Sequence, residues 1–396
     1  MAARSGVFIV GAKRTAFGAF GGKLLNKSAN DLAEVACRAA VKAASVAPEN
    51  VDSIVLGNCI QTSKDSPYLA RHVSLRIGLP LHVPALTINR LCGSGFQSII
   101  NAAHEIILGE SKVVLAGGTE SMSQAPFVVR GIRFGTQLGQ KHEFEDALWE
   151  GLTDLHIKTP MGITAESLGA NYNITRQECD EFALRSQTRW RLAKNAGYFK
   201  QEVVPVTLKT RKGEEEFDVD EHPREVTIEG LNKLPPVFKK DGLVTAGNAS
   251  GVSDGAGACV IAGEEAVKDL HLSPLARIVG WKVVGCDPHL MGYGPVPAVR
   301  ALLEQTGLSL DQMDLVEVNE AFAPQALAVQ KELGVDPDKM NVSGGAIAFG
   351  HPLAASGTRI MVHLTHELRR RQGKYAVGSA CIGGGQGIAM IIENTH

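Results

Sequence analysis

The chain has 396 residues, of which 44% are hydrophobic and 21% are charged, so it can bury a large core in more than one domain. Its formal net charge of −2 gives no general attraction to nucleic acid or to an acidic membrane surface. Seven cysteines without a Cys-x-x-Cys pair argue against a disulfide framework and a zinc ribbon, and no apolar run is long enough to span a bilayer.

Basic residues dominate the beginning of the chain. Arg4, Lys13 and Arg14 precede the first acidic residue, Asp31, and no secretory signal is expected. Such a segment fits an uncleaved mitochondrial address and a solvated loop equally well. The apolar run over residues 7–10 predicts the first strand.

The next informative stretch is Leu91-Cys-Gly-Ser-Gly-Phe96. It follows a predicted strand over residues 85–89 and precedes a predicted apolar helix over 97–109. Cys92 is therefore expected on a tight turn at a helix N-terminus, where exposed N–H groups and the helix dipole favour the nucleophilic thiolate. A cysteine in such a motif can equally be a buried packing residue, so the motif alone leaves both interpretations open.

The chain also repeats itself. Asp52, Ser94, His104 and Lys112 each have an identical residue 262 positions later, which are Asp314, Ser356, His366 and Lys374. These markers cover a strand, a helix start, a helix and a second strand, so they predict two copies of one strand–helix–strand unit. Apolar runs at 113–117, 276–281, 315–318 and 389–392 fit core strands that helices cover on both faces.

The last strands of the two copies match at an offset of only 130 positions, which places an insertion in the first copy. Inside it, Thr175 and Glu178 predict a capping box for a charged helix over 177–196, and residues 209–220 predict a polar hairpin. The predicted domains are a first core half at 1–118 plus 249–271, an inserted loop domain at 119–248 and a second core half at 272–396.

The duplication suggests how a reactive pair forms. His351 lies five residues before Ser356, the counterpart of Ser94 near Cys92. If a pseudo-two-fold axis relates the copies, the two helix starts converge and bring a base to a nucleophile. The alternative for His351 is a loop histidine that makes a structural hydrogen bond.

Two further candidates follow core strands. Cys381 comes after a strand expected over 375–378 and precedes three glycines, whose N–H groups can form an oxyanion hole. The alternative is a tight turn around a small buried residue. Asn319 follows the strand over 315–318, where it can hold a water, donate to an oxyanion or cap the next helix.

Four segments in order resemble the hallmark segments of the thiolase family, and the resemblance runs over essentially the whole chain. They are Asn89-Arg-Leu-Cys-Gly-Ser-Gly95, Asn319-Glu-Ala-Phe322, Gly344-Gly-Ala-Ile-Ala-Phe-Gly-His-Pro352 and Cys381-Ile-Gly-Gly-Gly-Gln-Gly387. Residues 68–80 and 145–149 are similar to the family branch of mitochondrial fatty-acid β-oxidation. The resemblance implies a duplicated α/β core in five layers, αβαβα, with an inserted loop domain.

The resemblance also implies an activity, the cleavage of 3-ketoacyl-CoA by CoA to acetyl-CoA and a shortened acyl-CoA. In this mechanism His351 deprotonates Cys92, which carries the acyl group. Cys381 protonates the departing enolate and later deprotonates the incoming CoA. A water on Asn319, with His351, stabilises the enolate oxygen, and the N–H groups of Cys92 and Gly383 hold the other oxyanion.

In the family the insertion binds CoA, which is a co-substrate, and no permanently bound cofactor or metal is expected. Arg224 and Thr227 match the positions at the nucleotide end; a guanidinium suits a phosphate. The positions that match the pantetheine channel are Leu152, Met161, Ala246, Ser250 and Phe322. The resemblance further implies a homotetramer, as a dimer of dimers, in the mitochondrial matrix, with the cytoplasm as the alternative. No nucleic-acid partner is expected.

Several alternatives have a discriminating residue. An acetoacetyl-CoA thiolase working in the condensing direction often has histidine before Met161, where this chain has Pro160. A ketoacyl synthase has histidine or asparagine in place of Cys381. A non-catalytic acyl-CoA or lipid carrier is expected to lack Cys92 or His351, and a cysteine hydrolase would leave Cys381 without a role.

Two positions depart from the family pattern. Ala16 stands where proline is usual, and Ala354, near the catalytic histidine, stands where glycine is usual. If position 354 requires a positive φ, alanine costs about 1 kcal/mol there and the rate is expected to fall.

Overall fold

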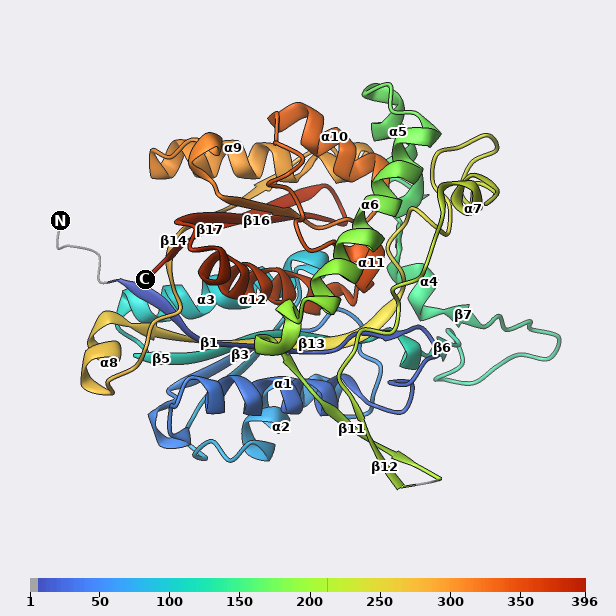
Figure 1. Ribbon diagram of the computed structural model, residues 1–396. Helices are drawn as coiled ribbons and strands as arrows, with labels where there is room; N and C mark the ends of the chain where they lie inside the picture. The colour runs from blue at the N-terminus through green and yellow to red at the C-terminus, as the bar shows by residue number, and fades with distance from the viewer. Residues whose placement is uncertain (1–5, 212) are drawn as a thin grey trace.

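The two copies form two sheets that stack with helices between and outside them. A computed structural model describes residues 6–211 and 213–396, so Arg4 of the basic leading segment lies outside the described residues. Figure 1 shows the layers in order: α1 and α2, the sheet with β1, β3, β5 and β13, the pair α3 and α12, the sheet with β14, β16 and β17, and finally α9 and α10. This arrangement is the predicted αβαβα order.

Each copy repeats the same strand order and direction. The first runs β1-β13-β5-β3-β4 and the second β14-β17-β16-β15, so four strands of each copy correspond. Among these described strands, the parallel pair is β3 with β5 in the first copy and β15 with β16 in the second. The strand bounds are β1 (Val7–Thr15), β3 (Ser53–Gly57), β4 (Ala85–Ile88), β5 (Val113–Ser121), β13 (Ser253–Gly263), β14 (Ala276–Gly285), β15 (Leu315–Val318), β16 (Tyr375–Ile382) and β17 (Gln386–Asn394). A short antiparallel pairing of β1 with β14 joins the two sheets.

Two carboxylates show that the copies are equivalent in detail. Oδ2 of Asp52 accepts hydrogen bonds from the backbone N–H groups of Lys112 and Val113, at 2.7 and 2.9 Å. Asp314 accepts the corresponding pair from Lys374 and Tyr375, at 2.6 and 3.1 Å. The predicted duplication is therefore confirmed at the level of individual hydrogen bonds.

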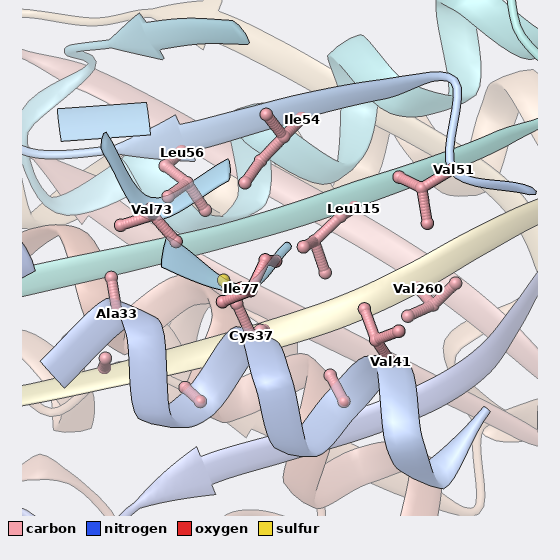
Figure 2. Packing of buried hydrophobic residues seen from close by; sticks show 14 of the residues in the cluster. Ala33, Cys37, Val41, Val51, Ile54, Leu56, Val73, Ile77, Leu115 and Val260 are labelled. Carbon is pink, nitrogen blue, oxygen red and sulfur yellow. The ribbon is translucent and has the colours of Figure 1, made fainter. Parts of the chain in front are cut away.

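The outer helix α1 shows how the sequence builds a layer. Ser28 and Asp31 form a reciprocal capping box at its start, which satisfies two N–H groups that a helix cannot pair internally. Figure 2 shows Cys37 and Val41 on its inner face, pointing toward Leu115 and Val260 of the sheet. Burial of these side chains fixes the helix on the outer face of the first sheet.

The helices have the following bounds. They are α1 (Ala29–Ala43), α2 (Leu69–Arg76), α3 (Ser94–Leu108), α4 (Ala147–Gly151), α5 (Met161–Asn171), α6 (Arg176–Asn195), α7 (Ile228–Asn232), α8 (Glu264–Asp269), α9 (Pro295–Thr306), α10 (Ala323–Leu333), α11 (Ala346–Phe349) and α12 (Leu353–Arg371). Within the described residues, none of them combines the length and apolarity that crossing a membrane requires.

Glycines let the two central helices, α3 and α12, approach closely. A Cβ atom added at Gly357 of α12 would lie 2.6 Å from the backbone N of Phe96 in α3. A Cβ atom at Gly95 would meet the backbone of Thr358 and the carbonyl of Ala354 in the same way. Because α12 also contacts the turn Leu91–Gly93, the starts of the two helices lie together in the middle layer.

The insertion begins later than expected. β5 continues through Ser121, and β13 begins at Ser253, so residues 119–121 belong to a core strand and the connecting segment is 122–252. The strand is extended because residues 113–121 pair with β13, a partner that local patterning does not reveal. The capping box of Thr175 and Glu178 starts α6 as predicted.

Short strands complete the structure. The predicted polar hairpin is formed by β11 and β12, and Figure 1 shows it projecting from the layers. The remaining strands are β2 (Gly18–Ala19), β6 (Phe127–Val128), β7 (Glu145–Asp146), β8 (Thr153–Asp154), β9 (Thr159–Pro160), β10 (Val203–Val204), β11 (Val206–Thr210) and β12 (Gly213–Phe217).

A buried ion network connects the insertion to both core halves. Arg14 of β1 donates from Nε to Glu202 at 2.8 Å and from Nη1 to Asp220 at 2.7 Å. The other oxygen of Glu202 lies 2.8 Å from Nδ1 of His363 in α12. Burial alone would lower the pKa of His363, but the charge and hydrogen bond of Glu202 raise it above its ordinary value. The network thus contains charged groups that compensate one another in the interior.

Candidate active site

Cys92 lies on a tightly held turn. Residues Leu91–Gly93 form one 3-10 turn, α3 follows at Ser94, and Leu91 has a φ of 46°. A positive φ at a leucine is unfavourable and persists only where surrounding contacts enforce it. Here the Ser94 hydroxyl accepts from the N–H of Arg90 at 2.8 Å and donates to the carbonyl of Leu91 at 2.7 Å. The predicted position at a helix start is confirmed.

His351 stands between α11 and α12. Gly350, with a φ of 91°, makes the turn that leads into it, and the His351 N–H donates to the Gly251 carbonyl at 2.8 Å. Its Nδ1 lies 2.6 Å from the Ser356 hydroxyl, and its Nε2 lies 3.5 Å from Nδ2 of Asn319. Since an amide nitrogen can only donate, Nε2 is the acceptor and the ring proton sits on Nδ1. The basic lone pair of the ring is therefore on Nε2, where the Asn319 amide approaches it at 3.5 Å.

Asn319 does not cap the next helix. That helix, α10, begins at Ala323, after Phe322. The Asn319 backbone N–H donates to the Ser379 carbonyl at 2.9 Å. Its side chain is fully buried, and within the described residues its Oδ1 has no hydrogen-bond partner. Of the roles considered for Asn319, the geometry leaves the ones that involve a water or an oxyanion.

Cys381 lies inside a strand rather than after one. The strand β16 does not end before Ser379 but continues to Ile382, because Cys381 pairs with Gly387 of β17. The expectation that this strand ends at residue 378 is therefore wrong. The predicted glycine turn does follow: Gly384 and Gly385 have φ values of 78° and 79°. Such a turn exposes backbone N–H groups to the adjacent space.

One cavity brings the candidates together. It has a volume of about 600 Å³, and Cys92, His351, Cys381 and Gly383 all line it. They come from three places in the chain: the turn before α3, the loop before α12 and the β16–β17 hairpin. Asn319 adjoins the cavity through its contact with His351. A nucleophile, a base, a second thiol and N–H donors in one pocket can carry out acyl transfer.

The electrostatics differ from the expectation at Cys92. Burial raises its pKa to about 11, and the N–H groups of Gly383 and of Cys92 itself only partly oppose this effect. Burial, with the charge of Arg359 nearby, lowers the pKa of His351 to about 4. Both groups are therefore neutral near pH 7, because burial outweighs the stabilisation of the thiolate that the backbone N–H groups at the helix start provide.

Cys381 is even more strongly kept as a thiol. Its side chain is 1% exposed, and burial raises its pKa far above the ordinary value, with the neighbouring Cys92 adding to the effect. A group that stays protonated at neutral pH is suited to donate a proton when a strong base forms beside it.

The predicted pantetheine contacts line the same cavity. These residues are Leu152, Met161, Ala246, Ser250 and Phe322. A second cavity of about 340 Å³ is lined by Arg224, Thr227 and Ala246, so Ala246 borders both. The Thr227 hydroxyl also accepts from the Gly230 N–H at 3.1 Å, at the start of α7. Thr227 therefore has a helix-capping role as well.

The concern about Ala354 is not supported. Ala354 is the second residue of α12 and does not have a positive φ. The backbone strain that alanine would suffer in the left-handed region therefore does not arise, and no loss of rate is expected from it.

Two polar residues of the site have no signal in the motifs. Ser356, a marker of the duplication, is the hydrogen-bond partner of His351. Glu120 is fully buried at the end of β5 and accepts from the Ala354 N–H at 3.1 Å. The one available hint is a carboxylate among apolar and small residues in Val113–Ser121.

Comparisons with known proteins agree along the whole chain. Residues 7–265 match the thiolase N-terminal domain, and residues 272–394 match the thiolase C-terminal domain. The mitochondrial 3-ketoacyl-CoA thiolase of Bos taurus is 65% identical over 396 residues, which covers 100% of both chains.

Two solved structures are similar in fold as well as in sequence. The crystal structure of human mitochondrial 3-ketoacyl-CoA thiolase has a TM-score of 0.98 and 62% identity, and it covers 99% of each chain. The human protein in complex with CoA has a TM-score of 0.97 and 61% identity, covering 99% of this chain and 98% of that one.

Proposed function

The chain belongs to the thiolase family, and on that premise we propose that it is an acyltransferase that cleaves 3-ketoacyl-CoA with CoA in fatty-acid β-oxidation. The products are acetyl-CoA and an acyl-CoA shortened by one acetyl unit. The observation that carries this proposal is the single cavity that holds Cys92, His351 and Cys381. We place the protein in mitochondria because its relatives are named as mitochondrial proteins. Within mitochondria, we propose the matrix.

The first half of the reaction forms an acyl-enzyme. Nε2 of His351 takes the proton of the Cys92 thiol, and the resulting thiolate attacks the keto carbon, C3. The C2–C3 bond then breaks, and Cys381 gives its proton to C2 of the departing enolate. Neutral His351 and neutral Cys381, which their pKa values below and above pH 7 support, are the forms that these steps require.

The second half releases the acyl group. The Cys381 thiolate takes the proton of an incoming CoA thiol, and that CoA thiolate attacks the acyl group on Cys92. Cys92 leaves as a thiolate and recovers its proton from His351, so every group returns to its starting state. The Gly383 N–H, whose interaction with Cys92 lowers the pKa of the thiol, supports a role for it in stabilising the tetrahedral oxyanion. The Asn319 amide is buried beside His351, which supports a role at the enolate oxygen.

Coenzyme A is proposed to bind along both cavities. The larger cavity would hold the pantetheine between the insertion and the core, and the smaller one would hold the nucleotide near Arg224 and Thr227. Ala246 borders both cavities, which supports a continuous path for CoA on the surface of one chain. The exposed Arg224 side chain can pair with a phosphate in a bidentate manner. A similar protein has been solved with CoA.

We also propose a homotetramer. The support is an apolar segment of the insertion whose side chains face solvent in the single chain: Phe127, Phe134, Leu138 and Phe144 are 64% to 107% exposed. Several large exposed apolar side chains on one segment are typical of a protein–protein interface. Edge strand β4 offers a second surface, since among the described residues it pairs with β3 alone.

A single assay tests the function. The protein is mixed with CoA and a series of 3-ketoacyl-CoAs, and loss of the ketoacyl-CoA enolate is followed. We expect CoA-dependent cleavage, no acyl-enzyme in Cys92→Ala, and a trapped but slowly released acyl group in Cys381→Ala. Absence of cleavage at every chain length would contradict the proposal. Normal turnover by Cys381→Ala would refute its acid–base role.

A further inference from the structure

A buried carboxylate with no part in the reaction steps lies next to the reactive turn. Glu120 is the eighth residue of β5, and its side chain is fully buried. An unpaired carboxylate in an interior is costly, so its hydrogen bonds indicate what it holds.

Four N–H donors surround the two oxygens of Glu120. Oε1 accepts from Nδ2 of Asn58 and from the Ile60 backbone N–H, each at 3.0 Å. Oε2 accepts from the backbone N–H of Cys59 at 3.2 Å and of Ala354 at 3.1 Å. Three of these donors belong to the loop after β3 in the first copy, and the fourth belongs to the second copy.

The fourth donor is the start of α12. Pro352, which precedes this helix, offers no side-chain acceptor, so the first-turn N–H groups need other partners. The N–H of Ala355 turns back to the Pro352 carbonyl at 2.9 Å, whereas that of Ala354 reaches Glu120. The carboxylate therefore acts as a helix cap supplied by the opposite copy.

This cap sits between the two reactive residues. His351 lies three residues before Ala354, and its ring is held by Ser356 in the same helix turn. On the other side, Cys59 packs in one apolar cluster with Cys92, and its thiol lies 3.7 Å from the Ser94 hydroxyl that fixes the Cys92 turn. Glu120 thus contacts the supports of both the base and the nucleophile.

We propose that Glu120 is a positioning residue, a shared carboxylate that fixes the start of α12, and with it His351, against the half that carries Cys92. The proposal rests on the proposed thiolase function. Its role is to hold Nε2 of His351 at the distance and angle from the Cys92 thiol that proton transfer requires.

The charge of Glu120 gives an independent readout. Burial raises the pKa of Glu120 to about 7, and the N–H groups of Ile60, Ala354 and Cys59 oppose this effect. The titratable groups that feel its charge are Cys59 and Cys92, and in both it adds to the effect of burial in raising the thiol pKa. Removing the charge should therefore move the ionisation of Cys92 to lower pH, which a purely structural residue would not do.

Two variants separate charge from reach. Glu120→Gln keeps the size but loses the charge, and its NH2 group faces two N–H donors that one oxygen of Glu120 accepts. Glu120→Asp keeps the charge but withdraws it by one methylene from Ala354. We expect both to lower the single-turnover rate of Cys92 acylation by roughly tenfold to 100-fold, with little change in KM for the acyl-CoA. Only Glu120→Gln should shift the pH profile of Cys92 alkylation by iodoacetamide to lower pH.

Asp52→Asn is the matched control. Asp52 also accepts backbone N–H groups, but at the opposite end of the same strand β5. Its acylation rate, measured on folded protein, should equal that of the wild type.

Three outcomes would overturn the proposal. They are a folded Glu120 variant that acylates at the wild-type rate, an equal loss in Asp52→Asn, and a failure of both Glu120 variants to fold, which would make Glu120 a determinant of folding instead. If the wild type itself formed no acyl-enzyme, the proposed function would fail. The alkylation profile needs no acyl-CoA and would still test the placement of Glu120.

Discussion

Around Cys92, two opposing effects act on one thiol. Backbone N–H groups at the helix start stabilise a thiolate, while burial in an apolar cavity destabilises it, and burial dominates. In the proposed mechanism, His351 generates the reactive thiolate when substrate is bound. If Cys92 and His351 are both neutral at rest, the site holds no permanent buried charge on this pair. The His351 ring then has the neutral Asn319 amide as a neighbour at Nε2, at 3.5 Å from Nδ2.

This balance predicts the pH dependence of Cys92 reactivity. Because the pKa of Cys92 is raised to about 11, its rate of alkylation by iodoacetamide should rise with pH throughout the range from 7 to 10. The rate is measured by mass spectrometry of the peptide that contains Cys92. In urea-unfolded protein, the same peptide should level off above a pKa of about 8.5. A plateau near pH 7 in the folded protein would show that the thiolate is already present at rest.

At this scale, the sequence motifs predicted residues that the fold brings together. Cys92, His351, Cys381 and Asn319 were predicted from patterns, and the structure brings the first three into one cavity. Glu120 could not be predicted in the same way. Its partner Ala354 is 234 residues away, and the contact exists only because the two copies pack together.

At the scale of elements, the contact between α3 and α12 determines how closely the two halves of the site approach. Both helices bury apolar side chains on more than one side because sheets cover them. The helix α12 is buried along most of its length. Glycine replaces a side chain where the backbones meet, so the separation of the helices is fixed by main-chain atoms rather than by flexible side chains.

Gly357→Ala should therefore destabilise the protein by about 1–3 kcal/mol, because the new Cβ atom meets the backbone N and the ring of Phe96 at 2.6 and 2.7 Å. Urea unfolding followed by circular dichroism measures this change. Gly285→Ala is the control, since a Cβ there has no atom within 4 Å, and it should change stability by less than about 0.5 kcal/mol. Equal midpoints for the two variants would contradict this account of the helix contact.

The elements themselves were predictable to the extent that they repeat. The offset of 262 located β3 against β15 and β5 against β16, and the structure confirms each pair. Two strands extend beyond the residues predicted for them: β5 runs to Ser121 instead of Gly117, and β16 runs to Ile382 instead of Gly378. Both strands run further because β13 and β17 pair with them, and pairing partners that are distant in sequence leave no trace in local periodicity.

At the scale of the molecule, the buried network of Arg14 and Glu202 joins three parts that the chain order separates. Arg14 comes from the first strand, Glu202 from the insertion and His363 from the last long helix. Replacing one partner leaves the others buried without compensation.

Glu202→Gln should consequently lower the free energy of unfolding by about 3–5 kcal/mol near neutral pH. The pKa of Glu202 is lowered to about 2 by His363 and Arg14 despite its burial, so its stabilisation is present above pH 4.5 and disappears as pH falls toward 2. The raised pKa of His363 adds stabilisation that is fully present below pH 6.5 and disappears as pH rises through the pKa of the folded state, which lies above 6.5.

Urea midpoints of the wild type and the variant over a series of pH values measure this effect. The control is Glu215→Gln, which breaks an exposed ion pair with Lys23 and should cost less than about 1 kcal/mol. A difference between wild type and Glu202→Gln that stays constant from pH 3 to pH 9, or that matches the control, would argue against this role of the network.

The glycine contact between α3 and α12 keeps the two parts of the site together when the protein is diluted. Cys92 and His351 lie directly before two packed helices, α3 and α12, of one polypeptide, so the local concentration of each around the other is set by a packing distance. Adding solvent lowers the number of reactive cavities per volume, but it leaves this local concentration unchanged. A duplicated chain thereby obtains at nanomolar levels the encounter that two separate half-domains would reach only by mass action.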